Sequence, residues 1–246
     1  MSGRPAALVT GASRGIGEEV ARRLADEGFD LTISARGTES LETLATELRE
    51  KCGVAVTVVR ADMSKSEDVT ALAAAHREAY GRADVLVLNA AMGAMGAFAD
   101  FPVRKLDLLF TINLRSAYVL SQELLPLLRE AGRTTKAGGK IIAVASTTGV
   151  VGEPLNSAYG ATKAGLITWC ETVTTEESVG GVIATAVCPG YVRTAMTEHM
   201  PSEVDWDDML PVEDVAEAIV SVTRLSSRTV IPQLVLTRPG PHLWRA

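Results

Sequence analysis

The chain has 246 residues and a formal net charge of −6 at pH 7, with 47% hydrophobic but only 4% aromatic residues. This acidic balance argues against nucleic acid or an anionic membrane as the main partner. No apolar run approaches the roughly 20 residues that cross a bilayer, and the N-terminal residues show no signal-peptide pattern. We therefore expect a cytoplasmic protein with a core of Ala, Val and Leu.

The length suits one large α/β domain over residues 1–246, since no linker or internal repeat divides the chain. Cys52, Cys170 and Cys188 are scattered and form no CxxC pair, and the three histidines are equally scattered. We therefore expect reduced thiols and no metal site.

The first predicted unit is a strand, a glycine-rich turn and a helix. Residues 6–10 (AALVT) form a short apolar run, GASRGIG follows, and residues 18–28 have an amphipathic helical pattern that ends at Gly28. Gly11 permits a tight turn, Gly15 lets the backbone approach a phosphate, and Gly17 lets helix and strand pack closely. The free N–H groups at the helix start suit a pyrophosphate. A purely structural loop is the alternative.

Strands and helices then alternate to the end of the chain. Further strands are expected at residues 30–35, 55–62, 84–91, 140–146, 182–190 and 229–236. The helices between them are expected at residues 38–51, 66–81, about 102–131, 157–173 and 212–225. Short apolar strands separated by helices predict a Rossmann-type doubly wound α/β domain, a parallel sheet of about seven strands with helices on both faces.

One stretch, STTGVVGEPLNSAYGATK, carries residues suited to proton transfer. Tyr159 and Lys163 are four residues apart in a predicted helix, so their side chains share one face, and Ser146 ends a predicted strand. A nearby cation lowers the pKa of a phenol, and a serine hydroxyl can hold a substrate oxygen. A Tyr-x-x-x-Lys pair alone is a weak signal, and an ordinary surface helix could carry one.

Taken together, these motifs resemble those of the classical short-chain dehydrogenase/reductase family over essentially the whole chain. Residues 10–17 (TGASRGIG) are similar to the family's TGxxxGxG turn, and residues 189–194 (PGYVRT) are similar to its PGxVxT segment. Asp62 and Asn113 match two further family positions. With Ser146 and the Tyr159–Lys163 pair these make six matches in the expected order, so coincidence is a poor explanation.

The resemblance implies a catalytic set of Asn113, Ser146, Tyr159 and Lys163. Tyr159 would be the acid or base at the substrate oxygen, and Ser146 would orient that oxygen. Lys163 would bind the nicotinamide ribose and depress the pKa of Tyr159. Asn113 would support a proton route from Lys163 to solvent.

The resemblance also implies a nicotinamide dinucleotide cofactor. Asp62 would bond the adenine, and Val192 and Thr194 would hold the carboxamide. The full expected set is Gly11, Ser13, Arg14, Gly15, Ile16, Gly17, Arg36, Asp62, Met63, Asn89, Tyr159, Lys163, Pro189, Gly190, Val192 and Thr194.

Charge at the end of the second strand favours NADP(H) over NAD(H). A carboxylate there would accept a hydrogen bond from the NAD ribose and repel a 2′-phosphate. Here Ala35 holds that place and Arg36 follows, with Glu39 beyond the expected position. Arg36 and Arg14 could both reach a 2′-phosphate, which arginine recognises well. Alternatively, Arg36 is only a solvated residue.

Three departures from the family pattern stand out. The usual NNAG is Leu88-Asn89-Ala90-Ala91 here, and Thr185 replaces a common asparagine. The C-terminus lacks the DGG-type ending that shapes subunit contacts, so the expected homodimer or homotetramer is less secure. Trp244 is either an interface anchor or part of a frayed tail.

By analogy with the family, substrate faces residues 92–98, residues 147–155, Tyr191 and a lid at residues 195–210. The first of these segments, MGAMGAF, suits an apolar, adaptable pocket. Met196, Met200 and Trp206 either cover the substrate or simply pack the lid onto the core.

The leading hypothesis is an NADP(H)-dependent oxidoreductase that interconverts a small apolar carbonyl compound, a ketone or 3-oxoacyl thioester, and a secondary alcohol. One alternative is an NAD-dependent alcohol or hydroxysteroid dehydrogenase. Another is a non-catalytic NADP-binding regulator, which would have no need of the Ser146, Tyr159 and Lys163 set.

Overall fold

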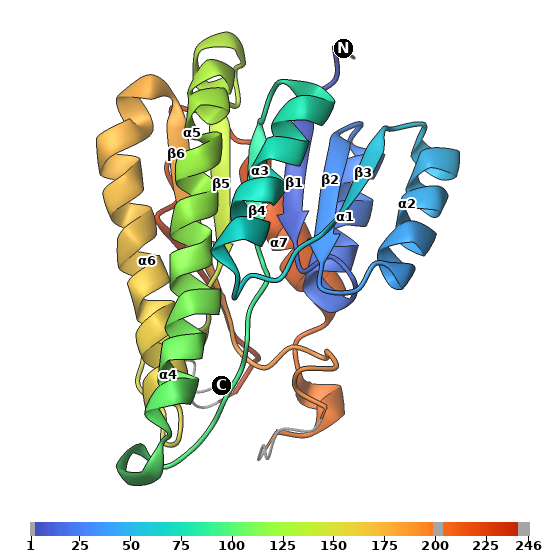
Figure 1. The fold of residues 1–246 in the computed structure, drawn as a ribbon. Helices are drawn as coiled ribbons and strands as arrows, with labels where there is room; N and C mark the ends of the chain where they lie inside the picture. The colour runs from blue at the N-terminus through green and yellow to red at the C-terminus, as the bar shows by residue number, and fades with distance from the viewer. Residues whose placement is uncertain (1–2, 199–203, 241–246) are drawn as a thin grey trace.

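The structure, a computed structural model, describes residues 3–198 and 204–240. Seven strands form one sheet in the order β3-β2-β1-β4-β5-β6-β7, and every neighbouring pair is parallel. This confirms the single doubly wound α/β domain (Figure 1). The strands are β1 (Ala6–Thr10), β2 (Asp30–Ala35), β3 (Val56–Arg60), β4 (Val85–Leu88), β5 (Gly139–Val144), β6 (Val182–Pro189) and β7 (Gln233–Leu236).

The helices cover both faces of the sheet. Each face has its own apolar core, one containing Val20, Leu41 and Val215, the other containing Leu120 and Leu166. Figure 1 shows α3, α5 and α6 together in front of the sheet. The helices are α1 (Gly15–Asp26), α2 (Glu39–Cys52), α3 (Ser66–Tyr80), α4 (Val103–Phe110), α5 (Ser116–Thr134), α6 (Ser157–Glu177) and α7 (Val212–Thr223).

Burial explains why the strands read as continuous apolar runs. Every residue of β1, β5 and β6 is buried, as expected for strands covered on both faces. The last strand is shorter than the 229–236 predicted, because Pro232 lacks an N–H and β7 begins only after it.

The long predicted helix at 102–131 is interrupted. A π-helical turn, Thr111–Arg115, joins α4 to α5, and Asn113 lies buried within it. Turns of this type often mark functional sites, because they redirect backbone groups without ending the helix. No propensity signal in TINLR distinguishes it from ordinary helix.

The strand order places a crevice beside the carboxyl ends of the strands. β1 lies between β2 and β4, so the connections leaving β1 and β4 run in opposite directions across the sheet. Ligands bind at such switch points in open α/β sheets.

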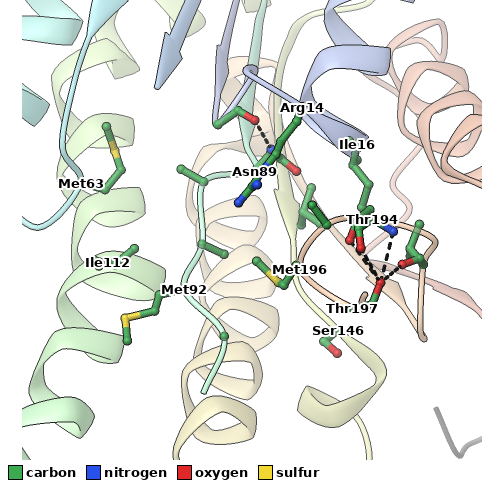
Figure 2. Close-up of a pocket in the computed structure, with 18 of the residues that line it drawn as sticks. Arg14, Ile16, Met63, Asn89, Met92, Ile112, Ser146, Thr194, Met196 and Thr197 are labelled. Carbon is green, nitrogen blue, oxygen red and sulfur yellow. Dashed lines mark hydrogen bonds between the residues drawn. The ribbon is translucent and has the colours of Figure 1, made fainter. Parts of the chain in front are cut away.

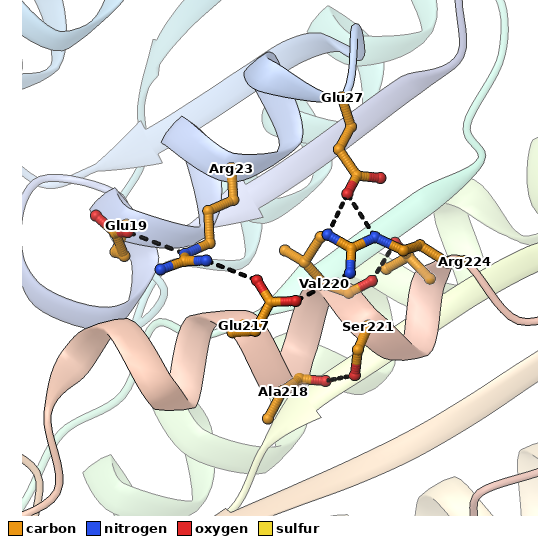
Figure 3. A network of polar contacts seen from close by, with 9 residues as sticks. Glu19, Arg23, Glu27, Glu217, Ala218, Val220, Ser221 and Arg224 are labelled. Carbon is orange, nitrogen blue, oxygen red and sulfur yellow. Dashed lines mark hydrogen bonds and ion pairs between the residues drawn. The ribbon is translucent and has the colours of Figure 1, made fainter.

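The last helix is tied to the helix that follows the glycine-rich turn. Arg23 of α1 pairs with Glu217 of α7, with a nitrogen–oxygen distance of 2.6 Å, and Arg224 bridges Glu217 and Glu27 (Figure 3). Because exposed ion pairs add little stability, the apolar contact beneath them carries most of the packing energy. The ion pairs link the C-terminal half of α1 to α7.

Candidate active site

A cavity of about 990 Å³ opens at the carboxyl edge of the sheet. It collects most of the residues singled out in the sequence. Its lining contains Gly11, Ser13, Arg14, Gly15, Ile16, Arg36, Asp62, Met63, Asn89, Ser146, Tyr159, Lys163, Pro189, Gly190, Val192 and Thr194. Gly17 and Asn113 lie outside this lining, but each contacts a residue that belongs to it, Gly11 and Met92 respectively. Figure 2 shows Arg14 and Asn89 at one end and Ser146 at the other.

The glycine-rich turn packs too tightly for side chains. A Cβ on Gly17 would lie 2.4 Å from the Gly11 carbonyl oxygen and 2.5 Å from Asn89 Nδ2. The α1 helix begins at Gly15, and no side chain caps its first N–H groups. Those N–H groups face the cavity with the positive end of the helix dipole, an arrangement that fits a pyrophosphate.

Asn89 holds this turn in place. Its Nδ2 donates to the carbonyl oxygens of Thr10 (3.0 Å) and Gly11 (3.1 Å), while the Thr10 hydroxyl accepts from the backbone N–H groups of Asn89 and Ala90. The role expected for Asn89 beside the cofactor is therefore at least partly structural.

The end of the cavity beside β1, β2 and β3 carries two cations and one carboxylate. Arg14 and Arg36 line it, and β2 ends at Ala35 with no acidic group in that place. The pKa of Asp62 is lowered, chiefly because the backbone N–H and hydroxyl of Ser64 donate to it, with the charge of Arg36 also contributing. Asp62 is therefore a carboxylate that can accept hydrogen bonds from a ligand.

The opposite end places Ser146, Tyr159 and Lys163 together. Ser146 follows β5, and the other two lie one turn apart on α6. Lys163 is 2% exposed, its Nζ donates to the Val144 carbonyl oxygen at 2.7 Å, and it lies 5.5 Å from the centre of the Tyr159 ring. The helix spacing predicted from the sequence is realised.

The electrostatics of this pair correct one expectation. The pKa of Tyr159 is raised to about 12, because burial outweighs a hydrogen bond from Ser146 that lowers it. Burial also lowers the pKa of Lys163 to about 8. In the cofactor-free protein, therefore, burial sets the direction of the Tyr159 pKa shift, while the Lys163 ammonium donates to the Val144 carbonyl oxygen.

Asn113 lies behind the site. Its side chain accepts from the Met92 N–H (2.8 Å), donates to the Met92 carbonyl oxygen, and donates to Thr162 on α6 (3.1 Å). These bonds join the segment after β4 to α6. The side chain of Asn113 thus connects the segment after β4 to α6, the helix that carries Tyr159.

Thr197, one of the residues of the predicted lid, holds the segment after β6, and no motif singled it out within the lid. Its hydroxyl donates to the carbonyl oxygens of Val192 (2.5 Å) and Thr194 (2.9 Å), and it accepts from the Thr194 N–H (Figure 2). Thr148 and Glu153 also line the cavity; both fall within the predicted substrate segment 147–155, although neither was singled out there.

The predicted substrate segments are reached only in part. Met92, Met95 and Met196 line the cavity, whereas Phe98 is 86% exposed and lies outside it. Trp206 and Met196 are each more than 40% exposed, so neither is packed into the core as the alternative interpretation proposed. Met200 and Trp244 fall outside the described residues.

Within residues 3–198 and 204–240, no group of His, Cys, Asp and Glu side chains is placed to hold a metal ion. In the same ranges, no helix has the length and apolar character needed to cross a membrane.

Comparison with known proteins agrees with the site. A sequence model described as short chain dehydrogenase matches residues 5–205. A D-beta-hydroxybutyrate dehydrogenase of Cupriavidus necator is 33% identical over 92% of this chain and 85% of its own length. A protein of Streptomyces coelicolor named as a candidate ketoacyl reductase is 38% identical over 96% of this chain and 90% of its own.

A solved structure extends the likeness to three dimensions. An alcohol dehydrogenase from the archaeon Thermococcus sibiricus, complexed with 5-hydroxy-NADP, superposes with a TM-score of 0.86. It is 28% identical, and the match covers 96% of this chain and 99% of that one. The family resemblance seen in the sequence is thereby confirmed, and this chain belongs to the short-chain dehydrogenase family of oxidoreductases.

Proposed function

We propose that this enzyme uses NADP(H) to interconvert a ketone or 3-oxoacyl compound and the corresponding secondary alcohol. The observation that carries the proposal is a single cavity with proton-transfer groups at one end and two arginines at the other. Ser146, Tyr159 and Lys163 supply the first end. Arg14 and Arg36 supply the second.

The shape of the cavity supports a dinucleotide. The Gly15 end of α1 would take the pyrophosphate, Asp62 the adenine, and the segment held by Thr197 the carboxamide. When bound, the cofactor supplies the hydride. The protein's part is to position the reacting carbon, exclude water and supply the proton.

The proton chemistry favours carbonyl reduction. A phenol with a pKa of about 12 is neutral near pH 7, so Tyr159 holds a proton to give to the substrate oxygen as negative charge develops there. Ser146 donates a hydrogen bond to the same oxygen, and the Lys163 ammonium stabilises the phenolate that remains. Lys163 and the Asn113 turn would then return a proton from solvent.

The cation pair supports NADP(H) rather than NAD(H). A 2′-phosphate adds negative charge near the ends of β1 and β2, where Arg14 and Arg36 line the cavity and no carboxylate follows Ala35. Arginine can bind such a phosphate through two parallel N–H donors.

The substrate end supports a neutral substrate. Of the described lining residues, the charged ones at this end are Lys163, which is buried behind Tyr159, and Glu153. Burial raises the pKa of the Tyr191 phenol, and the charge of Glu153 nearby adds to that rise. A carboxylate-bearing substrate would meet this negative charge, whereas an apolar ketone would meet Met92, Met95 and Met196.

The test is NADPH oxidation by the purified protein against apolar ketones, diketones and 3-oxoacyl thioesters, with NADH in parallel. Tyr159→Phe should keep cofactor affinity and lose turnover by roughly 10²–10⁴-fold. Full activity in that variant would remove Tyr159 from its role. Bound NADPH with no turnover of any substrate in the panel would count against the reductase proposal and favour a regulator.

A further inference from the structure

The hydroxyl of Ser146 accepts two hydrogen bonds from one neighbouring residue. The backbone N–H of Thr148 donates to Ser146 Oγ at 3.2 Å, and the Thr148 hydroxyl donates to the same atom at 3.0 Å. A serine hydroxyl has two acceptor lone pairs and one proton. With both lone pairs occupied by Thr148, the remaining function of this hydroxyl is to donate.

The turn that carries Thr148 is held rigidly against the catalytic helix. Thr147–Gly149 forms a single 3₁₀ turn that follows β5, and Thr148 is 8% exposed. A Cβ on Gly149 would lie 2.7 Å from the backbone carbon of Lys163, so turn and helix touch through their backbones. The Thr148 hydroxyl is therefore fixed relative to both Ser146 and α6.

The direction of the Ser146 proton matters for Tyr159. When Ser146 donates, its proton points to the phenol oxygen or to a substrate oxygen beside it, which both stabilises charge and leaves the phenol proton available. When Ser146 has an open lone pair, its oxygen can accept the phenol proton and so compete with the substrate for it. The two orientations differ by one rotation about the Ser146 C–O bond.

We propose that Thr148 is a positioning residue, which locks the Ser146 hydroxyl as a donor toward the reacting oxygen. The predicted effect on kcat rests on the reductase function proposed above. The orientation of the Ser146 hydroxyl does not depend on that function. Thr148 lines the cavity, yet its hydroxyl acts through Ser146 and transfers no proton.

The first test is kinetic. Thr148→Val keeps the shape and the backbone N–H but removes the hydroxyl donor, and Thr148→Ser restores it. We expect kcat for carbonyl reduction to fall about tenfold in Thr148→Val, less than the roughly 10²–10³-fold loss expected on removing the donor itself in Ser146→Ala. KM and NADPH affinity should stay within about twofold, and Thr148→Ser should recover most of kcat, because the lost contact is one hydrogen bond.

The second test needs no substrate. The chain has four tyrosines, so a ¹³C label at the ring carbon that bears the hydroxyl gives few resonances, and the one missing in Tyr159→Phe belongs to Tyr159. That carbon reports whether the phenol oxygen accepts or donates a hydrogen bond. We expect its resonance in the cofactor-free protein to move in Thr148→Val toward the Ser146→Ala position, and to return in Thr148→Ser.

The two tests separate failure of the proposal from failure of the proposed function. A wild-type protein that reduces nothing would end the reductase assignment, while the resonance would still decide the orientation. An unmoved Tyr159 resonance in Thr148→Val would overturn the positioning role, whatever the kinetics. Equal losses of kcat and melting temperature in Thr148→Val and Thr148→Ser would also overturn it, since packing alone would then explain the effect.

Discussion

His76 makes the stability of this enzyme sensitive to mild acid. Its side chain on α3 is fully buried, Nδ1 lies 2.8 Å from the Thr32 hydroxyl, and the Tyr80 ring packs edge-on against it. Burial lowers its pKa from 6.5 to about 4, although Asp84 nearby opposes the change. The unfolded chain therefore takes up a proton at a higher pH than the folded one. The part of the folding free energy that depends on a neutral His76 is therefore complete above about pH 6.5 and is lost as the pH falls toward 4.

The size of the effect follows from the two pKa values. Each unit of difference is worth about 1.4 kcal/mol, so His76 costs about 2 kcal/mol at pH 5 and about 3 kcal/mol near pH 4. Urea unfolding at pH 7.5 and pH 5 measures the loss. His76→Gln keeps a buried polar side chain that does not titrate, so it should be less stable at pH 7.5 but should lose about 2 kcal/mol less on acidification. If wild type and variant lose the same amount, His76 is not the titrating group.

Three further outcomes are expected. Arg36→Ala should weaken NADPH binding much more than NADH binding. Arg60 is an exposed arginine outside the cavity lining, so Arg60→Ala should change the binding of neither cofactor. Equal losses for both cofactors in Arg36→Ala would refute the 2′-phosphate assignment. Gly17→Ala should destabilise the fold by roughly 1–3 kcal/mol in urea unfolding, because its Cβ would overlap the Gly11 carbonyl oxygen. The kcat/KM for alcohol oxidation should rise from about pH 6 to 7, where the phenolate of Tyr159 becomes less scarce and Lys163, with a pKa of about 8, stays mostly charged, while carbonyl reduction should not; a flat oxidation profile would place the base elsewhere.

The sheet and the positions of the site residues could be predicted from the sequence because each depends on local pattern. A buried parallel strand requires an apolar run such as residues 182–187, and a close helix–strand crossing requires glycine at residue 17. The i, i+4 spacing of Tyr159 and Lys163 likewise sets their shared face before any tertiary contact is known.

The supporting hydrogen bonds could not be predicted, because they depend on which hydroxyl lies near which oxygen in three dimensions. Thr148 and Thr197 have no periodicity or spacing that distinguishes them, yet each fixes a cavity segment through its hydroxyl. No sequence pattern predicts the π turn around Asn113 either, because its residues are compatible with ordinary helix.

The pKa of Tyr159 in the cofactor-free protein is raised, whereas the sequence predicted a lowering by Lys163, and the physical reason for the difference bears on the mechanism. Proximity in sequence guarantees that Lys163 lies near Tyr159, but the effect of its charge depends on where the ammonium points and on how deeply both groups are buried. Here Lys163 donates to Val144, and burial moves the two pKa values apart, upward for the phenol and downward for the ammonium. A phenol held neutral in this way cannot lose its proton before a stronger base forms beside it. In the carbonyl reduction that we propose, the developing alkoxide would be such a base, so burial would tie proton release by Tyr159 to the arrival of charge on the substrate oxygen.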